Sequence, residues 1–178
     1  MMACSGKFRY GYHQGPSVAC HVIELPYAGE GFSLIAILPL EWDGLAELES
    51  KLTMENLATW LGSLQETKVV VLLPKFRLQT GFSLGETLSA MGMSDAFGGN
   101  ADFSGIDGTN MLYISSVLHR AFVEVNEEGT AAAAVTATHV RTKSMTPSFH
   151  ADHPFLFLIR DNRSGSILFL GRLVDPTK

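Results

Sequence analysis

The sequence has little cysteine, no excess of basic residues and no long apolar run. Its 178 residues carry 13 Lys and Arg against 18 Asp and Glu, a net charge of −5. This balance argues against nucleic acid as a partner, because phosphate binding needs clustered positive charge. The best apolar run, residues 32–40, is about half of a ~20-residue membrane span, and the first residues lack the apolar core of a signal peptide. We therefore expect no membrane partner.

The few cysteines and histidines show no metal-ligand spacing. Cys4 and Cys20 could form one disulfide or could both be free thiols. Two cysteines therefore do not decide between an extracellular and a cytoplasmic location. His119, His150 and His153 lack a spaced set of Cys, His or acidic partners, which favours structural or surface roles. No metal and no cofactor is expected.

Hydrophobic residues make up 46% of the chain and charged residues 17%, which suits a folded domain or a piece of a larger one. Short alternating or continuous apolar runs predict strands, and leucines at helical spacing predict short helices. The fold class is α+β with mostly antiparallel strands. We expect strands at 8–12, 18–25, 32–38, 68–73, 76–78, 112–125, 155–160 and 166–173, helices at about 44–51, 53–64 and 84–91, a loop at 98–109 and a hairpin turn at 161–165.

One segment does not follow these patterns. Residues 130–138 are rich in alanine, which favours helix, and end in valine and threonines, which favour strand. The polar and basic residues 139–147 follow without any period. This composition suits a segment that changes conformation, and it also suits a weak surface helix followed by an ordinary loop.

Several motifs occur in an order that resembles the serpin family. Residues 122–130 (FVEVNEEGT) resemble the end of a long strand of the large sheet running into the hinge of the reactive-centre loop, and 151–155 (ADHPF) with 167–172 (ILFLGR) resemble the closing strands. The other matching segments are GKFRY (6–10), ELPY (24–27), LPKF (73–76), MGMSDAF (91–97) and ADFSG (101–105). The resemblance covers essentially the whole chain.

This resemblance implies a serpin-like multi-sheet fold, with mostly antiparallel strands and a few short helices, incomplete at its N-terminus. Residues 1–178 resemble the C-terminal portion of a serpin domain, including a reactive-centre loop at about 127–150. The N-terminal helices and the central strands of the large sheet have no counterpart. We therefore expect the chain to be a fragment, a truncated product or an incomplete gene model, with the missing N-terminal half as a partner.

By resemblance, the chain is a suicide-substrate inhibitor of serine proteases, whose cleaved loop inserts into a sheet. Thr130, Ala132, Ala134 and Thr136 would face inward, where small side chains fit, and Gly129 supplies backbone freedom. The family usually has glutamate in place of Ala131, on the outward face. The hinge comprises Glu127, Glu128, Gly129, Thr130, Ala131, Ala132, Ala133, Ala134, Val135 and Thr136.

The family's spacing from Glu127 places the reactive bond between Lys143 and Ser144, with Arg141–Thr142 as the alternative. A basic residue before the scissile bond fits the acidic specificity pocket of trypsin-like proteases. The alternative for Lys143 is an ordinary basic residue in an accessible loop.

Three other functions compete with inhibition. A non-inhibitory serpin acting as a carrier or chaperone-like binding protein would be favoured by bulky, charged or proline residues on the inward hinge face, which is small here. An inactive truncated relic would expose unpaired strand edges and aggregate. An enzyme is disfavoured, because Ser148, Asp152 and His153 are neighbours in sequence and no Gly-x-Ser-x-Gly elbow occurs.

Overall fold

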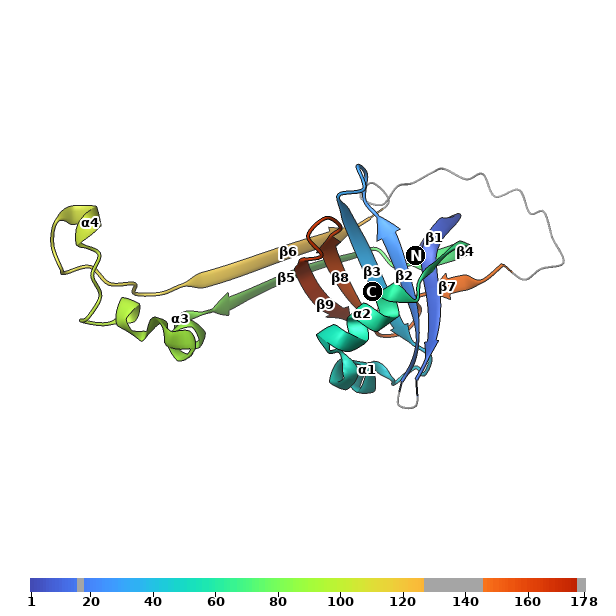
Figure 1. The fold of residues 1–178 in the computed structure, drawn as a ribbon, viewed down its shortest axis with the longest axis horizontal. Coiled ribbons are helices and arrows are strands. Elements are labelled where there is room, and N and C mark those ends of the chain that lie inside the picture. Colours follow the sequence, from blue (N-terminus) through green and yellow to red (C-terminus); the bar gives the residue numbers. More distant parts are fainter. Residues whose placement is uncertain (16–17, 127–145, 176–178) are drawn as a thin grey trace. The chain divides into compact units, whose positions relative to one another are not determined.

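The computed structural model describes residues 1–15, 18–126 and 146–175. Contacts divide the chain into two compact units (Figure 1), one formed by Met1–Phe76 with Val125–Lys178 and the other by Arg77–Glu124.

The first unit is built on a seven-stranded sheet in the order β7-β4-β1-β2-β3-β8-β9. All of its strand pairs are antiparallel except β4 with β7, which is parallel. This arrangement confirms an α+β class with an antiparallel bias. The strands are β1 (Met2–Gln14), β2 (Ala19–Pro26), β3 (Phe32–Pro39), β4 (Gln65–Leu73), β7 (Ser148–His150), β8 (Phe155–Asp161) and β9 (Ile167–Leu173).

Strand β3 lies in the middle of the core and is buried along both faces from Ser33 to Pro39. Its continuous apolar sequence predicts this position, because a strand covered on two sides needs apolar residues at every step. Alternate side chains of β3, such as Ile35 and Ile37, lie on one face of the strand and belong to a core cluster with residues of α1 and α2. The side chains on the opposite face of β3, such as Leu34, are equally buried.

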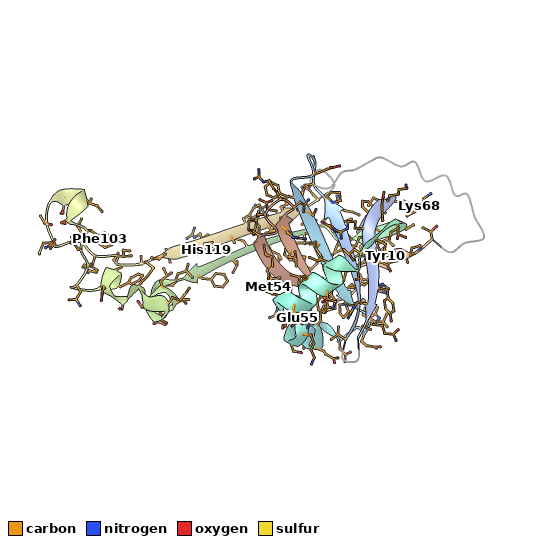
Figure 2. The ribbon with its side chains drawn as sticks, in the orientation of Figure 1. Tyr10, Met54, Glu55, Lys68, Phe103 and His119 are labelled. Atoms are coloured by element: carbon orange, nitrogen blue, oxygen red, sulfur yellow. The ribbon has the colours of Figure 1, made fainter. Side chains whose placement is uncertain are left out.

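The two predicted helices lie on one face of this sheet (Figure 1) as α1 (Leu45–Lys51) and α2 (Met54–Gly62). The hydroxyl of Thr53 caps α2 by accepting a hydrogen bond from the Asn56 amide at 3.1 Å, the usual contact of a threonine before a helix. Figure 2 shows Met54 and Glu55 in the first turn of α2. Within the described ranges, no helix has the length and apolar character needed to cross a membrane. The helices and the residue that follows α2 and Ser63 contribute Leu48, Leu57, Trp60, Leu61 and Leu64 to the core cluster.

The second unit holds a two-stranded sheet of β5 (Phe76–Ser83) and β6 (Leu118–Val125), which begin and end it. Between them lie four short helical segments. Gly92 lies inside the second of these and interrupts its helical geometry with a φ of 104°, a left-handed value that glycine adopts without strain. The segments are α3 (Gly85–Leu88), the π-helical Ser89–Met93, the 3₁₀-helical Ser94–Phe97 and α4 (Ser104–Asp107).

Two sequence predictions for the second unit are wrong. The strand expected over 112–125 begins only at Leu118, because upstream the Ile114 amide bonds the Ala96 carbonyl at 2.9 Å rather than a neighbouring strand. The loop expected over 98–109 contains the single turn α4. There the Asp102 carboxylate accepts from the Ser104 amide at 3.1 Å, and Gly108 closes the turn with a φ of 78°.

Other boundaries shift outward. Strand β1 extends over 13 residues where five were expected, because β2 pairs with one end and β4 with the rest. Strand β5 continues to Ser83 beyond the expected Leu78. The hairpin between β8 and β9 is confirmed, with Gly165 at a φ of 77° and the Asp161 amide donating to the Ser166 carbonyl at 2.9 Å.

We predict that Gly171→Ala destabilises the protein by about 1–3 kcal/mol. Gly171 lies opposite Phe157, and an added Cβ would lie 2.6 Å from the ring of this buried side chain. Gly62→Ala is the matched control, since no atom lies within 4 Å of its added Cβ and alanine favours helix. Urea unfolding of both variants measures the difference. Equal stability of the two variants would show that the Phe157 ring yields freely.

Candidate functional site: the two anchors of the loop segment

The expected reactive loop connects β6 to β7, and most of it lies outside the described residues. This holds for the whole hinge from Glu127 to Thr136, for the expected reactive bond Lys143–Ser144 and for the alternative bond Arg141–Thr142. The structure does describe the strand that leads into the segment and the strand that follows it, which are called its upstream and downstream anchors.

The upstream anchor is β6, which ends at Val125. Val125 is buried, whereas Leu118 and Phe122 are 68% and 45% exposed. The guanidinium of Arg77 on β5 lies 4.8 Å from the centre of the Phe122 ring, a cation–π contact across the two-stranded sheet. Figure 2 labels His119 on the same strand. Among the described strands, β5 alone pairs with β6.

The downstream anchor is β7, an edge strand of three residues that sequence patterns missed. It pairs parallel with β4, placing Phe149 beside Val71. Two further hydrogen bonds extend this pairing, from the Val70 amide to the Pro147 carbonyl at 3.0 Å and from the Ala151 amide to the Leu72 carbonyl at 2.9 Å. The alternation of exposed Ser148, buried Phe149 and exposed His150 is a strand signal, but three residues are too few to interpret.

After β7, the segment leading into β8 is fixed through His153. This side chain is buried, and both of its ring nitrogens are engaged: Nδ1 lies 2.7 Å from Asp152 Oδ1, and Nε2 lies 2.7 Å from the Pro39 carbonyl oxygen at the end of β3. The Trp42 ring packs against the imidazole at a centroid distance of 5.1 Å. His150 Nδ1 approaches the second carboxylate oxygen of Asp152 at 3.2 Å.

The surroundings of this imidazole lower the pKa values of two neighbouring groups, Asp152 and His21. Burial by itself would raise the pKa of Asp152, but the hydrogen bond from His153 and the charge of His150 outweigh it, so the pKa is lowered and the carboxylate is ionised at neutral pH. Burial, followed by the positive charge of His153, lowers the pKa of His21 on β2. The neutral His21 ring is paired with the Tyr10 hydroxyl at an O–Nδ1 distance of 2.7 Å.

This arrangement has the carboxylate and imidazole of a hydrolytic triad but lacks its geometry. In a triad, the imidazole nitrogen away from the carboxylate takes the proton of a nucleophile. Here that nitrogen faces the Pro39 carbonyl, which has no proton to give. In the part of the chain that the structure describes, no group of three or more His, Cys, Asp or Glu side chains is placed to hold a metal ion.

Cys4 and Cys20 are both free thiols. Cys20 is buried in the core cluster, and burial raises the pKa of its thiol to about 11. Burial also raises the pKa of the Cys4 thiol. Both thiols are therefore protonated and poorly nucleophilic at neutral pH, which suits packing rather than chemistry.

The comparisons with known proteins agree with the fold. The sequence profile of the family described as "Serpin (serine protease inhibitor)" matches residues 1–176. Human Serpin B3 is 49% identical over 89% of the chain, intracellular coagulation inhibitor 2 of Tachypleus tridentatus is 45% identical over 96%, and human leukocyte elastase inhibitor is 44% identical over 99%. The crystal structure of uncleaved ovalbumin superposes with a TM-score of 0.80 at 34% identity and covers 98% of the chain.

The chain spans less than half the length of these relatives: 42% of Serpin B3, 42% of the coagulation inhibitor, 48% of the elastase inhibitor and 44% of the ovalbumin chain. The family match nevertheless runs through both units and through the segment between the two anchors. Together with the identity to curated serpins, it shows that this chain belongs to the serpin family.

Proposed function

We propose that this chain supplies the reactive-centre loop and its two anchors to an inhibitor of trypsin-like serine proteases, not to an enzyme. The observation that carries the proposal is the position of β6. It ends at Val125, two residues before the hinge sequence that begins at Glu127. Two of the relatives are named as inhibitors, of leukocyte elastase and of coagulation.

The proposed mechanism begins with attack of the protease serine on the carbonyl carbon of Lys143, which forms an acyl-enzyme and releases the segment beginning at Ser144. The freed hinge then adds to a sheet as a new strand, a mode of strand addition established for serpins. About a dozen new backbone hydrogen bonds, at roughly 0.5–1.5 kcal/mol each, amount to roughly 10 kcal/mol. This is comparable to the stability of a whole domain, so insertion can displace the protease before the acyl-enzyme hydrolyses.

The inserted strand needs a neighbour on each side. We place it beside β6, whose second edge has no paired strand among the described residues. A two-stranded sheet is marginally stable alone, and large apolar side chains on β5 and β6, including Phe82, Leu118 and Phe122, are exposed. We therefore propose that the other neighbour comes from a serpin N-terminal half, and that inhibition needs both halves.

The hinge sequence favours inhibition over carrier function. Alternate side chains of an inserted strand enter the sheet interior. The residues that would do so, Thr130, Ala132, Ala134 and Thr136, are small enough to pass between neighbours without overpacking.

We predict that brief exposure to trypsin cuts the chain first after Lys143 and releases a fragment beginning at Ser144, because a loop substrate must be accessible and lysine fits the protease pocket. Intact-mass spectrometry of the products identifies the bond. Lys143→Ala removes this cut, whereas Arg141→Ala, the matched control two residues away, leaves it unchanged. First cuts outside 140–145 would show that the reactive-loop assignment is wrong.

We further predict that the chain, refolded with the N-terminal half of human leukocyte elastase inhibitor, forms an adduct with trypsin that survives denaturing gel electrophoresis. Ala134→Glu reduces the ratio of adduct to cleaved inhibitor about tenfold or more, because insertion would bury an unpaired carboxylate. Ala133→Glu, on the outward face, is the matched control and keeps the ratio.

The opposite ranking of these two variants would reverse the face assignment of the hinge. Cleavage without any adduct, in the refolded two-chain protein with an unchanged hinge, would argue for a substrate or carrier in place of an inhibitor.

A further inference from the structure

We propose that Asn162 accepts an N-linked glycan in the unfolded chain, that the folded chain uses the same side chain as a clasp, and that the two uses exclude each other. The clasp is the set of hydrogen bonds from Asn162 to Glu30, Gly31 and Ser33. Residues 162–164 are Asn-Arg-Ser, which is the Asn-x-Ser motif of N-glycosylation. The proposal goes beyond the inhibitory function and does not depend on it.

Asn162 lies in the hairpin turn between β8 and β9, next to the turn between β2 and β3. The two turns are neighbours because β3 pairs with β8, with Phe32 opposite Asp161. The backbone amide of Asn162 donates to the Gly31 carbonyl at 2.9 Å. Residues 162–164 are all exposed, so the motif lies at the surface of the first unit.

The side chain of Asn162 uses both protons of its amide nitrogen. Nδ2 donates to the Glu30 carbonyl and to the Ser33 hydroxyl, each at 2.8 Å. A side-chain amide nitrogen has two protons to donate, so this nitrogen is saturated. Ser33 is 1% exposed, and water therefore cannot readily replace Asn162 as the donor to its hydroxyl.

The turn before β3 is shaped to present these acceptors. Glu30 has a φ of 56°, a left-handed value that is uncommon for a residue with a side chain, and Gly29 before it has a φ of 86°. The Glu30 amide donates to the Tyr27 carbonyl at 3.0 Å, which closes the turn. In this conformation the carbonyls of both Glu30 and Gly31 accept from Asn162. An uncommon backbone conformation persists where surrounding contacts hold it, and the clasp supplies such contacts.

The serine of the motif is also held in the folded chain. The Asp161 carboxylate accepts from the amides of Arg163 at 2.8 Å and Ser164 at 3.1 Å. The Ser164 hydroxyl lies 3.0 Å from the Ser166 hydroxyl. Because the motif consists of the asparagine amide and the serine hydroxyl, a transferase must reach both groups. In the folded chain both are engaged, so we expect modification to require local opening of the two turns.

Glycosylation and the clasp compete for one nitrogen. The donor is an oligosaccharide joined to a lipid through pyrophosphate. The anomeric carbon of its first sugar forms a bond to Nδ2 of Asn162, Nδ2 loses one proton, and the lipid pyrophosphate leaves. The modified nitrogen keeps a single proton and can make at most one of its two hydrogen bonds. The sugar must also occupy the place of the lost bond, next to the buried Ser33. A glycan therefore keeps the clasp open, and a closed clasp keeps the glycan off.

The test is glycosylation of the full chain by a eukaryotic oligosaccharyltransferase with a lipid-linked oligosaccharide. One sample is folded and the other is freshly diluted from urea. We expect the freshly diluted chain to be modified at Asn162 about tenfold faster or more, because the folded chain reacts only through its opened fraction. Mass spectrometry of peptides locates the glycan. Equal rates for the two samples, or no glycan on the freshly diluted chain, would overturn the proposal.

Two variants and the glycosylated chain test the clasp itself. Ser164→Ala destroys the motif but leaves Asn162 in place, and we expect it to remain without glycan and to keep its urea midpoint. Asn162→Gln destroys both the motif and the clasp, and its midpoint should fall by about 0.5 M or more. The chain that carries a glycan trimmed to one sugar should show a similar fall after refolding. A midpoint of Asn162→Gln equal to that of Ser164→Ala, or an unchanged midpoint of the glycosylated chain, would show that glycan and fold do not compete.

Discussion

The double-sided burial of β3 is the constraint on which the rest of this chain depends. Because both faces of β3 are covered, each edge of the strand must also be paired, by β2 from the preceding sequence and by β8 from more than a hundred residues later. Pairing with β8 joins the two sequence parts of the first unit, Met1–Phe76 and Val125–Lys178. The second unit, with its own two-stranded sheet of β5 and β6, lies in sequence between those two parts.

The two anchors of the loop segment differ in strength. Strand β6 has eight residues and a partner in β5, while β7 has three residues on a sheet edge. For the proposed reactive-centre loop, which would be presented to a protease and then inserted into a sheet, this difference between the anchors has a physical consequence. The weakly held end is the one whose release needs less free energy, and the contacts of Ala151 and His153 set how much.

The differences between expectation and structure have a common origin. Residues 112–117 have a strand-like sequence but no neighbouring strand, so the ladder starts at Leu118. Strand β7 has a partner but too short a pattern to be recognised. The turn α4 depends on one Asp102 hydrogen bond inside a glycine-rich stretch. In each case strand pairing or a local hydrogen bond decided the structure, and composition did not. Strands with long apolar patterns, such as β3 and β8, were predicted well because their pattern is sufficient by itself.

The sequence by itself determined the α+β class, the buried central strands and the order of motifs that marks a serpin, because these depend on local pattern and residue type. It also suggested the hinge and the Lys143 bond, which lie outside the described residues. Only the tertiary structure decided that His153 faces two acceptors, that His21 is paired with Tyr10, and that Asp152 and His153 form no triad. Protonation and reactivity depend on what surrounds a side chain, and those neighbours come from distant parts of the chain.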